Sequence, residues 1–402
     1  MTDPRPLFLP AEDRLPLLRC LLLPQAEARA AWRAWRAAHD LEALVDPRTF
    51  SLMPLVYRRL LALGESDPQL PILKGLYKKT WFRNHVLQRG FFQAVDVLGR
   101  AGIPVMAIKG VAALRYHGGD SGVRPMMDTD FMIPHADVAG AIDALCADGW
   151  VAKPAASAET LKAGLAARHH GWNFRRGDGE IDVHWHLLPQ DLSTAFDRLA
   201  WQHRQTSVVW GREVAVPSPT DHLIQAFVHA AGHSVVPSSV WAADAAHIVL
   251  RAGADVDWDR LVALTVERRL ILPVRDALAF LRHALDVPVP AAPLARLGAA
   301  PVFDAERLEY EANMLHALQH SALHHKARRH MREARLATGA ETAQRAAISL
   351  AALDARPVAT VTAPAAHPRA AAPAGRRPSI ASTARRAGLR LVTGWRQGPR
   401  RG

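Results

Sequence analysis

Cysteine is nearly absent from this chain. Cys20 and Cys146 are the two cysteines among 402 residues, and they lie far apart in the sequence, which excludes a disulfide framework and fits a reducing compartment. The sequence has no run of 18 or more apolar residues, and its start lacks a basic segment leading into an apolar stretch. We therefore expect neither a transmembrane helix nor a secretory signal. Together these absences predict a cytoplasmic location.

Acidic residues and lysine are missing from the end of the chain, residues 355–402. Arginine, alanine and proline dominate there, and such a composition cannot bury enough apolar surface to fold, so we predict a disordered basic tail. Its ten arginines account for +10 of the net charge of +12, which leaves about +2 for the rest of the chain. Because that remainder is nearly neutral, we expect no stable nucleic-acid track on it.

The remaining patterns predict an α+β fold in three regions, namely 1–100, 101–217 and 218–350. Residues 1–100 are typical of helices, with a long amphipathic helix over 76–98 and loops at 47–51 and 65–69. Residues 101–217 show short strand patterns between helices, which predicts a mixed sheet with flanking helices. The region 218–350 reads as helical throughout. The segments behind these predictions are strands at 104–108, 128–133, 172–176, 180–187, 207–210 and 213–216, and helices at 110–117, 135–147, 157–168, 221–233, 239–251, 258–268, 271–286 and 304–338.

Two acidic residues, Asp128 and Asp130, stand at the start of an apolar run that continues through residues 131–133. In a strand, residues two apart point to the same face. Two carboxylates placed together repel each other unless a cation, a proton or hydrogen bonds offset the repulsion. Hard divalent cations such as Mg²⁺ prefer oxygen ligands of this kind. The pair therefore predicts a metal site, although such spacing also occurs in turns and helix caps.

A third carboxylate, Asp182, follows in a later strand. Residues 179–187 alternate, with Ile181 and Val183 on one face and Asp182, His184 and His186 on the other. A hairpin turn at residues 177–179 precedes this strand. We predict that His184 orients Asp182 or a phosphate. A zinc site made by these histidines with those at 169 and 170 is a further possibility that the sequence leaves open.

Three residues between the N-terminal helical region and the acidic pair are predicted to contact phosphate. Lys109 and Gly110 end a short buried strand and begin a helix, where backbone N–H groups can meet a phosphate. Arg124 precedes Pro125, which favours an extended backbone at that position. Its guanidinium could form two parallel hydrogen bonds with phosphate oxygens or pair with an acid. On the preceding helix, Arg83 and Asn84 could face the same cleft or the solvent.

The order of these motifs resembles the nucleotidyltransferase superfamily with the DNA polymerase β-like fold. Residues 108–110, 124–125, 128–130 and 181–185 are similar to a poorly characterised bacterial branch of nucleotidyltransferase family proteins, and the resemblance covers roughly residues 75–250. The superfamily usually has Gly-Gly or Gly-Ser after the first strand. This chain has Gly110 followed by Val111, and the branch it resembles carries Lys-Gly there.

The resemblance implies a nucleotidyltransferase-type sheet and metal-dependent transfer of a nucleoside monophosphate from a nucleoside triphosphate to a hydroxyl acceptor. It implies that Asp128, Asp130 and Asp182 hold two Mg²⁺ ions. Lys109, Gly110, Arg124 and His184 would then contact the nucleotide. The acceptor, a small molecule or a protein, the choice of nucleotide and the oligomeric state are not indicated by any motif.

Two other classes of function remain open on the sequence. The fold could serve as a non-catalytic module that binds nucleotides or another protein, although the presence of all three carboxylates argues against this. The second of these classes is a metal-dependent hydrolase that uses the histidines. His229, His233 and His247, with Asp244, fall in the predicted helices at 221–233 and 239–251, where they could meet beneath the site or form buried hydrogen bonds.

Overall fold

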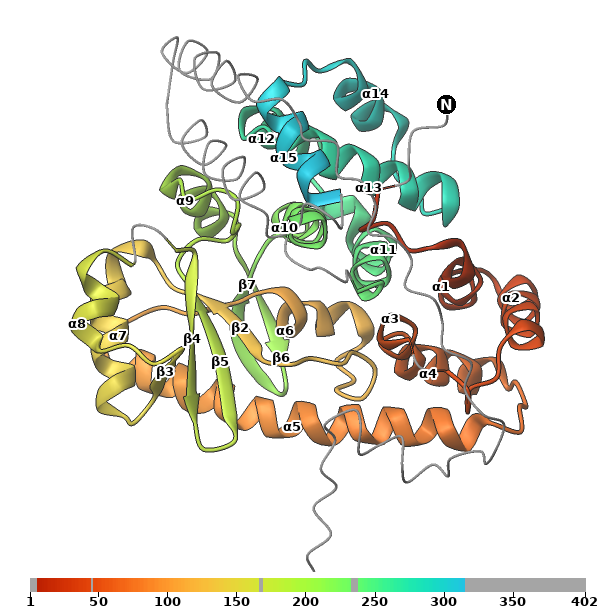
Figure 1. Cartoon of the computed structure of the whole chain (residues 1–402), viewed down its shortest axis with the longest axis horizontal. Helices are drawn as coiled ribbons and strands as arrows, with labels where there is room; N and C mark the ends of the chain where they lie inside the picture. Colours follow the sequence, from red (N-terminus) through yellow and green to blue (C-terminus); the bar gives the residue numbers. More distant parts are fainter. Residues whose placement is uncertain (1–5, 45, 166–168, 233–237, 315–402) are drawn as a thin grey trace, which may run out of the picture. The chain divides into compact units, whose positions relative to one another are not determined.

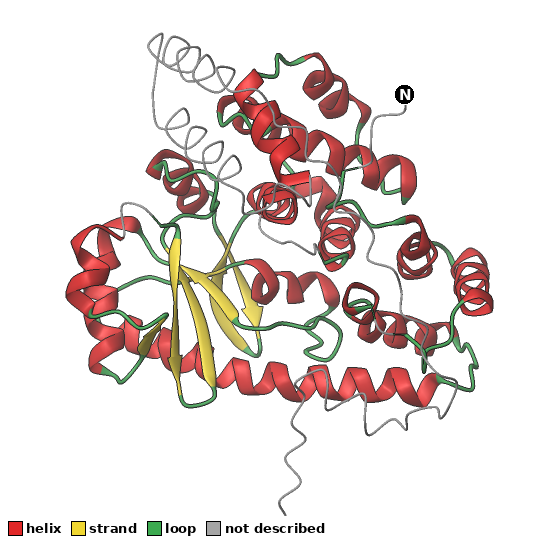
Figure 2. Cartoon of the chain, in the orientation of Figure 1, coloured by secondary structure: helices red, strands yellow, loops and turns green. Residues whose placement is uncertain are grey.

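The central element of the structure is a seven-stranded mixed sheet, drawn as arrows in Figure 1 and in yellow in Figure 2. The computed structural model describes residues 6–44, 46–165, 169–232 and 238–314. The strand order is β3-β4-β5-β2-β1-β7-β6, in which the pairs β2–β5 and β1–β7 are parallel and the other neighbours antiparallel. The predicted α+β fold with a mixed sheet is confirmed. The strands are β1 Met106–Ala107, β2 Thr129–Met132, β3 Val151–Lys153, β4 Gly171–Arg176, β5 Gly179–His184, β6 Gln205–Val209 and β7 Arg212–Val216.

The chain before the sheet is helical, as predicted, but the loop expected at 47–51 is wrong. The short helix α3 begins at Pro47, because Asp46 accepts hydrogen bonds from the backbone N–H groups of Arg48 and Thr49 and so caps it. Proline at the first helical position also favours this start. The loop predicted at 65–69 is confirmed. The helices are η1 Glu12–Arg14, α1 Leu15–Leu22, α2 Gln25–Ala38, α3 Pro47–Phe50, α4 Met53–Leu63 and α5 Leu70–Arg100.

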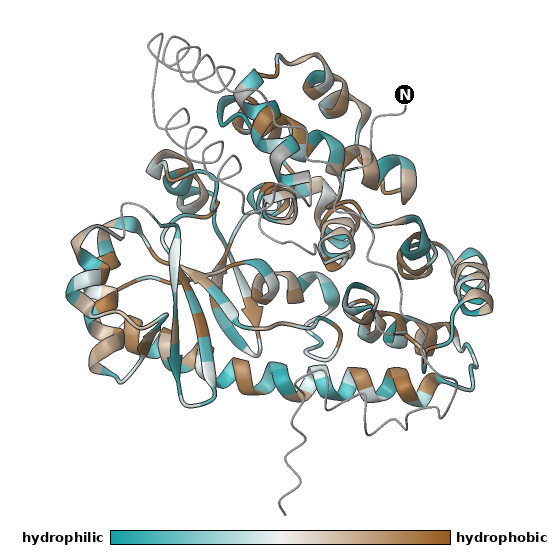
Figure 3. Ribbon diagram, viewed as in Figure 1, coloured by the Kyte–Doolittle hydropathy of each residue, from teal (hydrophilic) through white to brown (hydrophobic). Residues whose placement is uncertain are grey.

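The long helix α5 runs across the sheet and approaches it closely at one point. A Cβ atom added to Gly90 would lie 3.0 Å from the Cα atom of Gly179 at the start of β5, so glycine permits this backbone contact. The adjacent Phe91 packs edge to face on Phe131 of β2. Brown and teal alternate along α5 in Figure 3, as expected for a helix with one buried face. The sequence therefore anchors this helix to the strand pair β2–β5.

The remaining helices lie between the strands and after the last one. Those predicted at 221–233, 239–251, 258–268 and 271–286 are confirmed, whereas α9 and α14 were not predicted. The predicted helix 304–338 is described up to residue 314, and the predicted tail at 355–402 lies outside the described residues. These helices are α6 Lys109–Ala113, η2 Leu114–His117, η3 His135–Asp137, α7 Val138–Ala147, α8 Ala158–Thr160, the π-helical turn η4 Leu161–Leu165, α9 Thr194–Gln202, α10 Pro219–Gly232, α11 Val240–Ala252, η5 Gly253–Asp255, α12 Trp258–Glu267, α13 Ile271–Ala284, α14 Ala291–Ala299 and α15 Asp304–Met314.

The two faces of the sheet bury different hydrophobic cores, and this determines where the acidic residues point. Phe131 packs in the core that contains Phe91 and other residues of α5 and α7. Met132, the next residue in β2, packs in the core formed largely by helices α10–α13 and the N-terminal helices. Since side chains two apart share a face, Asp130 points to the same face as Met132. Asp130 therefore faces away from α5.

Among the described residues, no helix combines the length and the apolar composition that a bilayer span requires. The longest of them, α5, carries charged side chains along its length, including Lys74, Lys78 and Arg89. This agrees with the expectation drawn from the lack of long apolar runs.

Candidate functional site

The candidate site begins with two aspartates that face each other across paired strands. Asp130 of β2 is the register partner of Asp182 of β5 in the parallel pairing. Paired residues of neighbouring strands lie about 5 Å apart and point to the same face. Ile181 and Val183, on either side of Asp182, are buried in the core on the opposite face, as the alternation of this strand predicts. The sequence therefore brings the second and third predicted carboxylates together, although about fifty residues separate them.

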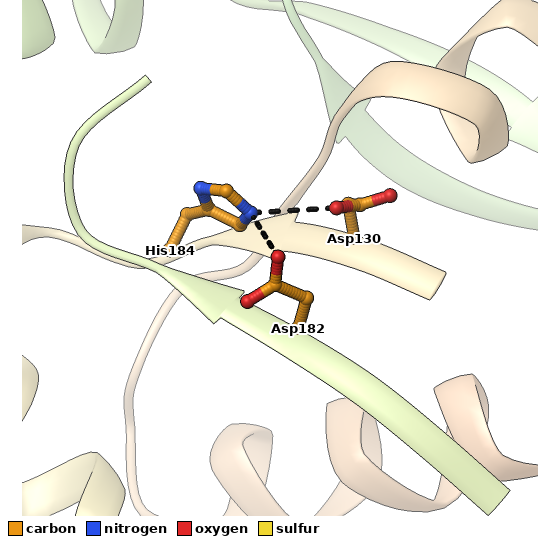
Figure 4. Close-up of side chains that lie close together, drawn as sticks. All are labelled: Asp130, Asp182 and His184. Carbon is orange, nitrogen blue, oxygen red and sulfur yellow. Dashed lines mark hydrogen bonds and ion pairs between the residues drawn. The ribbon is translucent and has the colours of Figure 1, made fainter. Parts of the chain in front are cut away.

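His184 lies at the end of β5 and connects the two carboxylates, as Figure 4 shows. Its Nε2 atom is 2.8 Å from Oδ2 of Asp182 and 3.3 Å from Oδ1 of Asp130. The imidazole is completely buried. One ligand atom from each of Asp130, Asp182 and His184 lies within 4.8 Å of the others. Among the described residues, these three side chains are the group that could hold a metal ion.

Lys109 inserts its ammonium group into this cluster. Its Nζ atom is 2.5 Å from Oδ1 of Asp130, 3.1 Å from Nε2 of His184 and 3.6 Å from Oδ2 of Asp182. The backbone at Lys109 has φ +47°, a conformation that side chains other than glycine rarely adopt. Gln225 of α10 accepts a hydrogen bond from the Lys109 N–H over 3.1 Å and so helps to fix this turn between β1 and α6. The strained turn directs the lysine at the carboxylates.

The charges in the cluster stabilise one another. Burial alone would raise the pKa of Asp130, but Lys109 and His184 hold that pKa well below its usual value. Asp182 shows the same balance, with burial opposed by His184 and Lys109 and a lowered pKa. Burial would lower the pKa of Lys109 and of His184, but the neighbouring aspartates raise both. Asp130 and Asp182 are therefore ionised and Lys109 is protonated near neutral pH.

Asp128 stands beside this cluster without joining it. It lies directly before β2 and is partly exposed. Its carboxylate makes no hydrogen bond or ion pair with any residue that the structure describes. Burial, together with repulsion from Asp130 and Asp182, raises the pKa of Asp128 to about 7, against a smaller opposing effect of Lys109. Asp128 therefore interacts with the other two carboxylates through its charge, but its oxygen atoms accept no hydrogen bond from the described residues.

The raised pKa of Asp128 predicts a pH dependence of stability. Because the folded state favours the protonated carboxyl, it binds more protons than the unfolded state between pH 3.8 and about 7, so the free energy of unfolding should fall as pH rises through this range. Asp128→Asn should remove this fall and stabilise the protein by about 1–3 kcal/mol at pH 8 but little at pH 4. Urea unfolding at both pH values in the presence of a chelator measures the effect. An equal change at pH 4 and pH 8 would contradict it.

The free oxygen atoms fit a divalent cation. Lys109 and His184 approach Oδ1 of Asp130 and Oδ2 of Asp182, while the second oxygen of each carboxylate accepts no hydrogen bond within the described part of the chain. They are oxygen donors of the kind that Mg²⁺ prefers, and Asp128, which lies outside the group of close ligand atoms, adds a negative charge beside them. The donor set thus suits a hard cation better than zinc, for which a larger share of nitrogen or sulfur ligands is typical.

Arg124 and Gly110, predicted to contact phosphate, lie against each other. A Cβ atom added to Gly110 would be 2.2 Å from Nη1 of Arg124, so only glycine leaves space for the guanidinium at this position. Gly110 follows Lys109 directly, which places Arg124 beside the turn that carries the lysine. The Nε atom of Arg124 donates to Oδ2 of Asp244 over 2.9 Å. The arginine therefore has the acidic partner that the sequence allowed, and it also borders the cluster.

One histidine and one asparagine occupy other positions than the sequence suggested. His186 does not face Asp182; its Nδ1 atom lies 2.6 Å from the buried carboxylate of Asp197. Asn84 neither faces a cleft nor the solvent; it is fully buried and donates to the backbone carbonyl groups of Ser121 and Arg124. His233 lies outside the described residues. The alternation that identified His184 ends with the strand, so it could not place His186.

Sequence reasoning missed two contributors to the site. His117 lies 2.7 Å from Asp244, and Gln225 binds the backbone of Lys109. His117 ends η2 and Gln225 lies in α10, both outside the recognised motifs. For Gln225 the available signal was a polar residue within an apolar stretch of helix.

The comparisons with known proteins agree with this geometry. No curated protein matches the chain, and no solved structure does. The model of a family described as "Uncharacterised nucleotidyltransferase" matches residues 48–286, more than half of the chain and the whole of the cluster. The chain therefore belongs to the uncharacterised nucleotidyltransferase family.

Proposed function

We propose that this protein is a metal-dependent nucleotidyltransferase that moves a nucleoside monophosphate from a nucleoside triphosphate to a hydroxyl group. The observation that supports it most is the convergence of Asp130, Asp182, His184 and Lys109 on one face of the parallel pair β2–β5. Family membership agrees with this activity. The acceptor is a small molecule or a protein, and we keep the prediction that the protein acts in the cytoplasm.

Asp128, Asp130 and Asp182 would hold Mg²⁺, as two ions in the arrangement that the resemblance implies. When bound, Mg²⁺ neutralises phosphate charge and lowers the pKa of a hydroxyl group. Lys109 and Arg124 would contribute positive charge toward the phosphate groups that leave. Gly110 would let Arg124 approach the start of α6, and His184 would keep the Asp182 carboxylate oriented.

The transfer forms one bond and breaks one. The acceptor oxygen attacks the α-phosphorus, the bond from that phosphorus to the bridging oxygen breaks, and pyrophosphate leaves with the electron pair. The acceptor proton passes to a carboxylate.

A nucleotide-binding screen followed by a labelling assay tests the proposal. Each of ATP, GTP, CTP and UTP, with and without Mg²⁺, should be compared by thermal shift, and at least one should raise the melting temperature in the presence of the metal. The same nucleotides labelled at the α-phosphate should then transfer label to an acceptor in a mixture of candidate small molecules and proteins. Transfer of the labelled nucleoside monophosphate to water alone, with no labelled acceptor, would indicate a hydrolase instead.

A non-catalytic module gives a different result in the same experiments. It would bind a nucleotide or a protein without forming pyrophosphate under any condition. The donor set described above is rich in oxygen and suits Mg²⁺. Stoichiometric zinc in the purified protein would instead favour a hydrolase that uses the histidines. Absence of any nucleotide binding with Mg²⁺ would overturn the proposed function.

A further inference from the structure

Arg124 is held in place by contacts from three directions, two of them made by residues outside the recognised motifs. Asn84 of α5, fully buried, donates to the Arg124 carbonyl over 2.8 Å and holds its backbone. Gly110 of α6 leaves the space that the Nη1 group fills. Asp244 of α11 accepts from Nε over 2.9 Å. Three helices, of which α11 is far from the other two in the sequence, therefore determine where Arg124 lies.

Asp244 is itself held in place and charged. It is 4 % exposed, and its second oxygen, Oδ1, lies 2.7 Å from Nε2 of His117. Burial opposes ionisation, but Arg124 and His117 hold the pKa of Asp244 well below its usual value. A buried carboxylate with a hydrogen-bond partner on each oxygen has one orientation available to it. It therefore fixes the direction of the Arg124 Nε–H bond and, with it, the plane of the guanidinium.

The outer nitrogens of Arg124 remain available. Neither Nη1 nor Nη2 donates a hydrogen bond to a residue in the described ranges, and the side chain is 17 % exposed. A guanidinium anchored through Nε presents both Nη groups as a fork, which matches two oxygens of a phosphate group. Since the Nη1 group lies against Gly110, next to Lys109, the fork borders the carboxylate cluster.

We propose that Asp244, supported by His117, is a positioning residue that holds Arg124 so that its Nη groups bind the phosphates of the nucleotide. This inference rests on the proposed function, because a nucleoside triphosphate is the ligand. It also assigns helix α11, which lies in the predicted helical region after the sheet, an indirect part in nucleotide binding, through Arg124. The competing explanation is an ion pair that serves only to attach α11 to the loop before β2.

A double-mutant cycle distinguishes the two explanations. Dissociation constants for the nucleotide that binds best with Mg²⁺ should be measured by calorimetry for the wild type, Asp244→Asn, Arg124→Ala and the double variant. We expect Arg124→Ala to weaken binding about 10- to 100-fold and Asp244→Asn about tenfold. The double variant should bind no more weakly than Arg124→Ala, because Asp244 acts through the arginine. Losses that multiply, or no loss in a folded Asp244→Asn protein, would overturn the inference.

Gly110→Ala tests the same arrangement while leaving Asp244 and His117 unchanged. The new methyl group must displace the guanidinium from its position, so nucleotide binding should weaken about tenfold. Gly99→Ala is the matched control, since a Cβ atom at this helical glycine meets nothing within 4 Å. If Asp244→Asn does not fold, His117→Gln replaces it in the cycle, with the same expected order of affinities.

The failure of the inference can be told from the failure of the proposed function. If the wild type binds no nucleotide with Mg²⁺, both are overturned. If it binds, and Arg124→Ala weakens binding but Asp244→Asn and Gly110→Ala do not, the nucleotide site stands and the positioning role is wrong. Equal affinity of Arg124→Ala and wild type would remove the arginine from the site and the inference with it.

Discussion

Asp128→Ala and Asp130→Ala should each abolish metal-dependent nucleotidyl transfer, with losses of about 10³-fold or more in kcat/KM. A metal ion that stabilises the developing charge contributes several kilocalories per mole, and each 1.36 kcal/mol corresponds to a factor of ten. Removing a carboxylate that would hold the ion removes most of that contribution. Transfer of label from an α-labelled nucleotide, measured over a range of Mg²⁺ concentrations, gives the change.

The two substitutions should differ in their effect on folding. The Asp128 carboxylate has no protein partner among the described residues, so Asp128→Ala should leave the free energy of unfolding at neutral pH unchanged or raised. Asp130→Ala removes the nearest partner of a buried lysine and should lower it. Asp96→Ala is the control, because that exposed carboxylate pairs with Arg212 on the protein surface. Full activity in both variants would remove these residues from the mechanism.

The local part of the site could be predicted from the sequence because it depends on short-range periodicity. Alternation along residues 180–184 placed Asp182 and His184 on one face, and the structure confirms this orientation. The apolar run after Asp130 likewise identified a buried strand. In each case the two-residue period of a strand fixes the direction of a side chain before any tertiary contact is known.

The contacts between distant elements could not be predicted in the same way. The meeting of Asp130 and Asp182 depends on the parallel pairing of β2 with β5, which are not consecutive strands, and nothing in either segment encodes that choice. Asp244 lies 120 residues after Arg124, on a helix whose partner was unknown. The position of Lys109 depends on a positive φ that few sequences would suggest for lysine. Sheet order and helix packing, rather than local pattern, determine these contacts.

Lys109→Met should cause the largest loss of stability among substitutions at this site, about 3–5 kcal/mol in the free energy of unfolding. The ammonium group lies among two carboxylates and a histidine, and methionine of similar length leaves the buried Asp130 and the half-buried Asp182 side by side without it. Their repulsion then has to be relieved by proton uptake or by His184 alone. Urea unfolding of the variant and the wild type at neutral pH measures the loss.

Added Mg²⁺ should recover part of this stability in the variant and less in the wild type. In the variant the two carboxylates have no lysine to neutralise them, so a divalent cation binds more tightly and stabilises the fold by mass action. In the wild type the cation must first compete with an ammonium group 2.5 Å from Asp130. Lys153→Met is the matched control, since this exposed lysine forms a surface ion pair with Glu180 and should cost no more than about 1 kcal/mol. Two outcomes would contradict competition between Lys109 and the metal for the same carboxylates. One is an equal loss of stability in Lys109→Met and Lys153→Met, and the other is equal stabilisation of wild type and Lys109→Met by Mg²⁺.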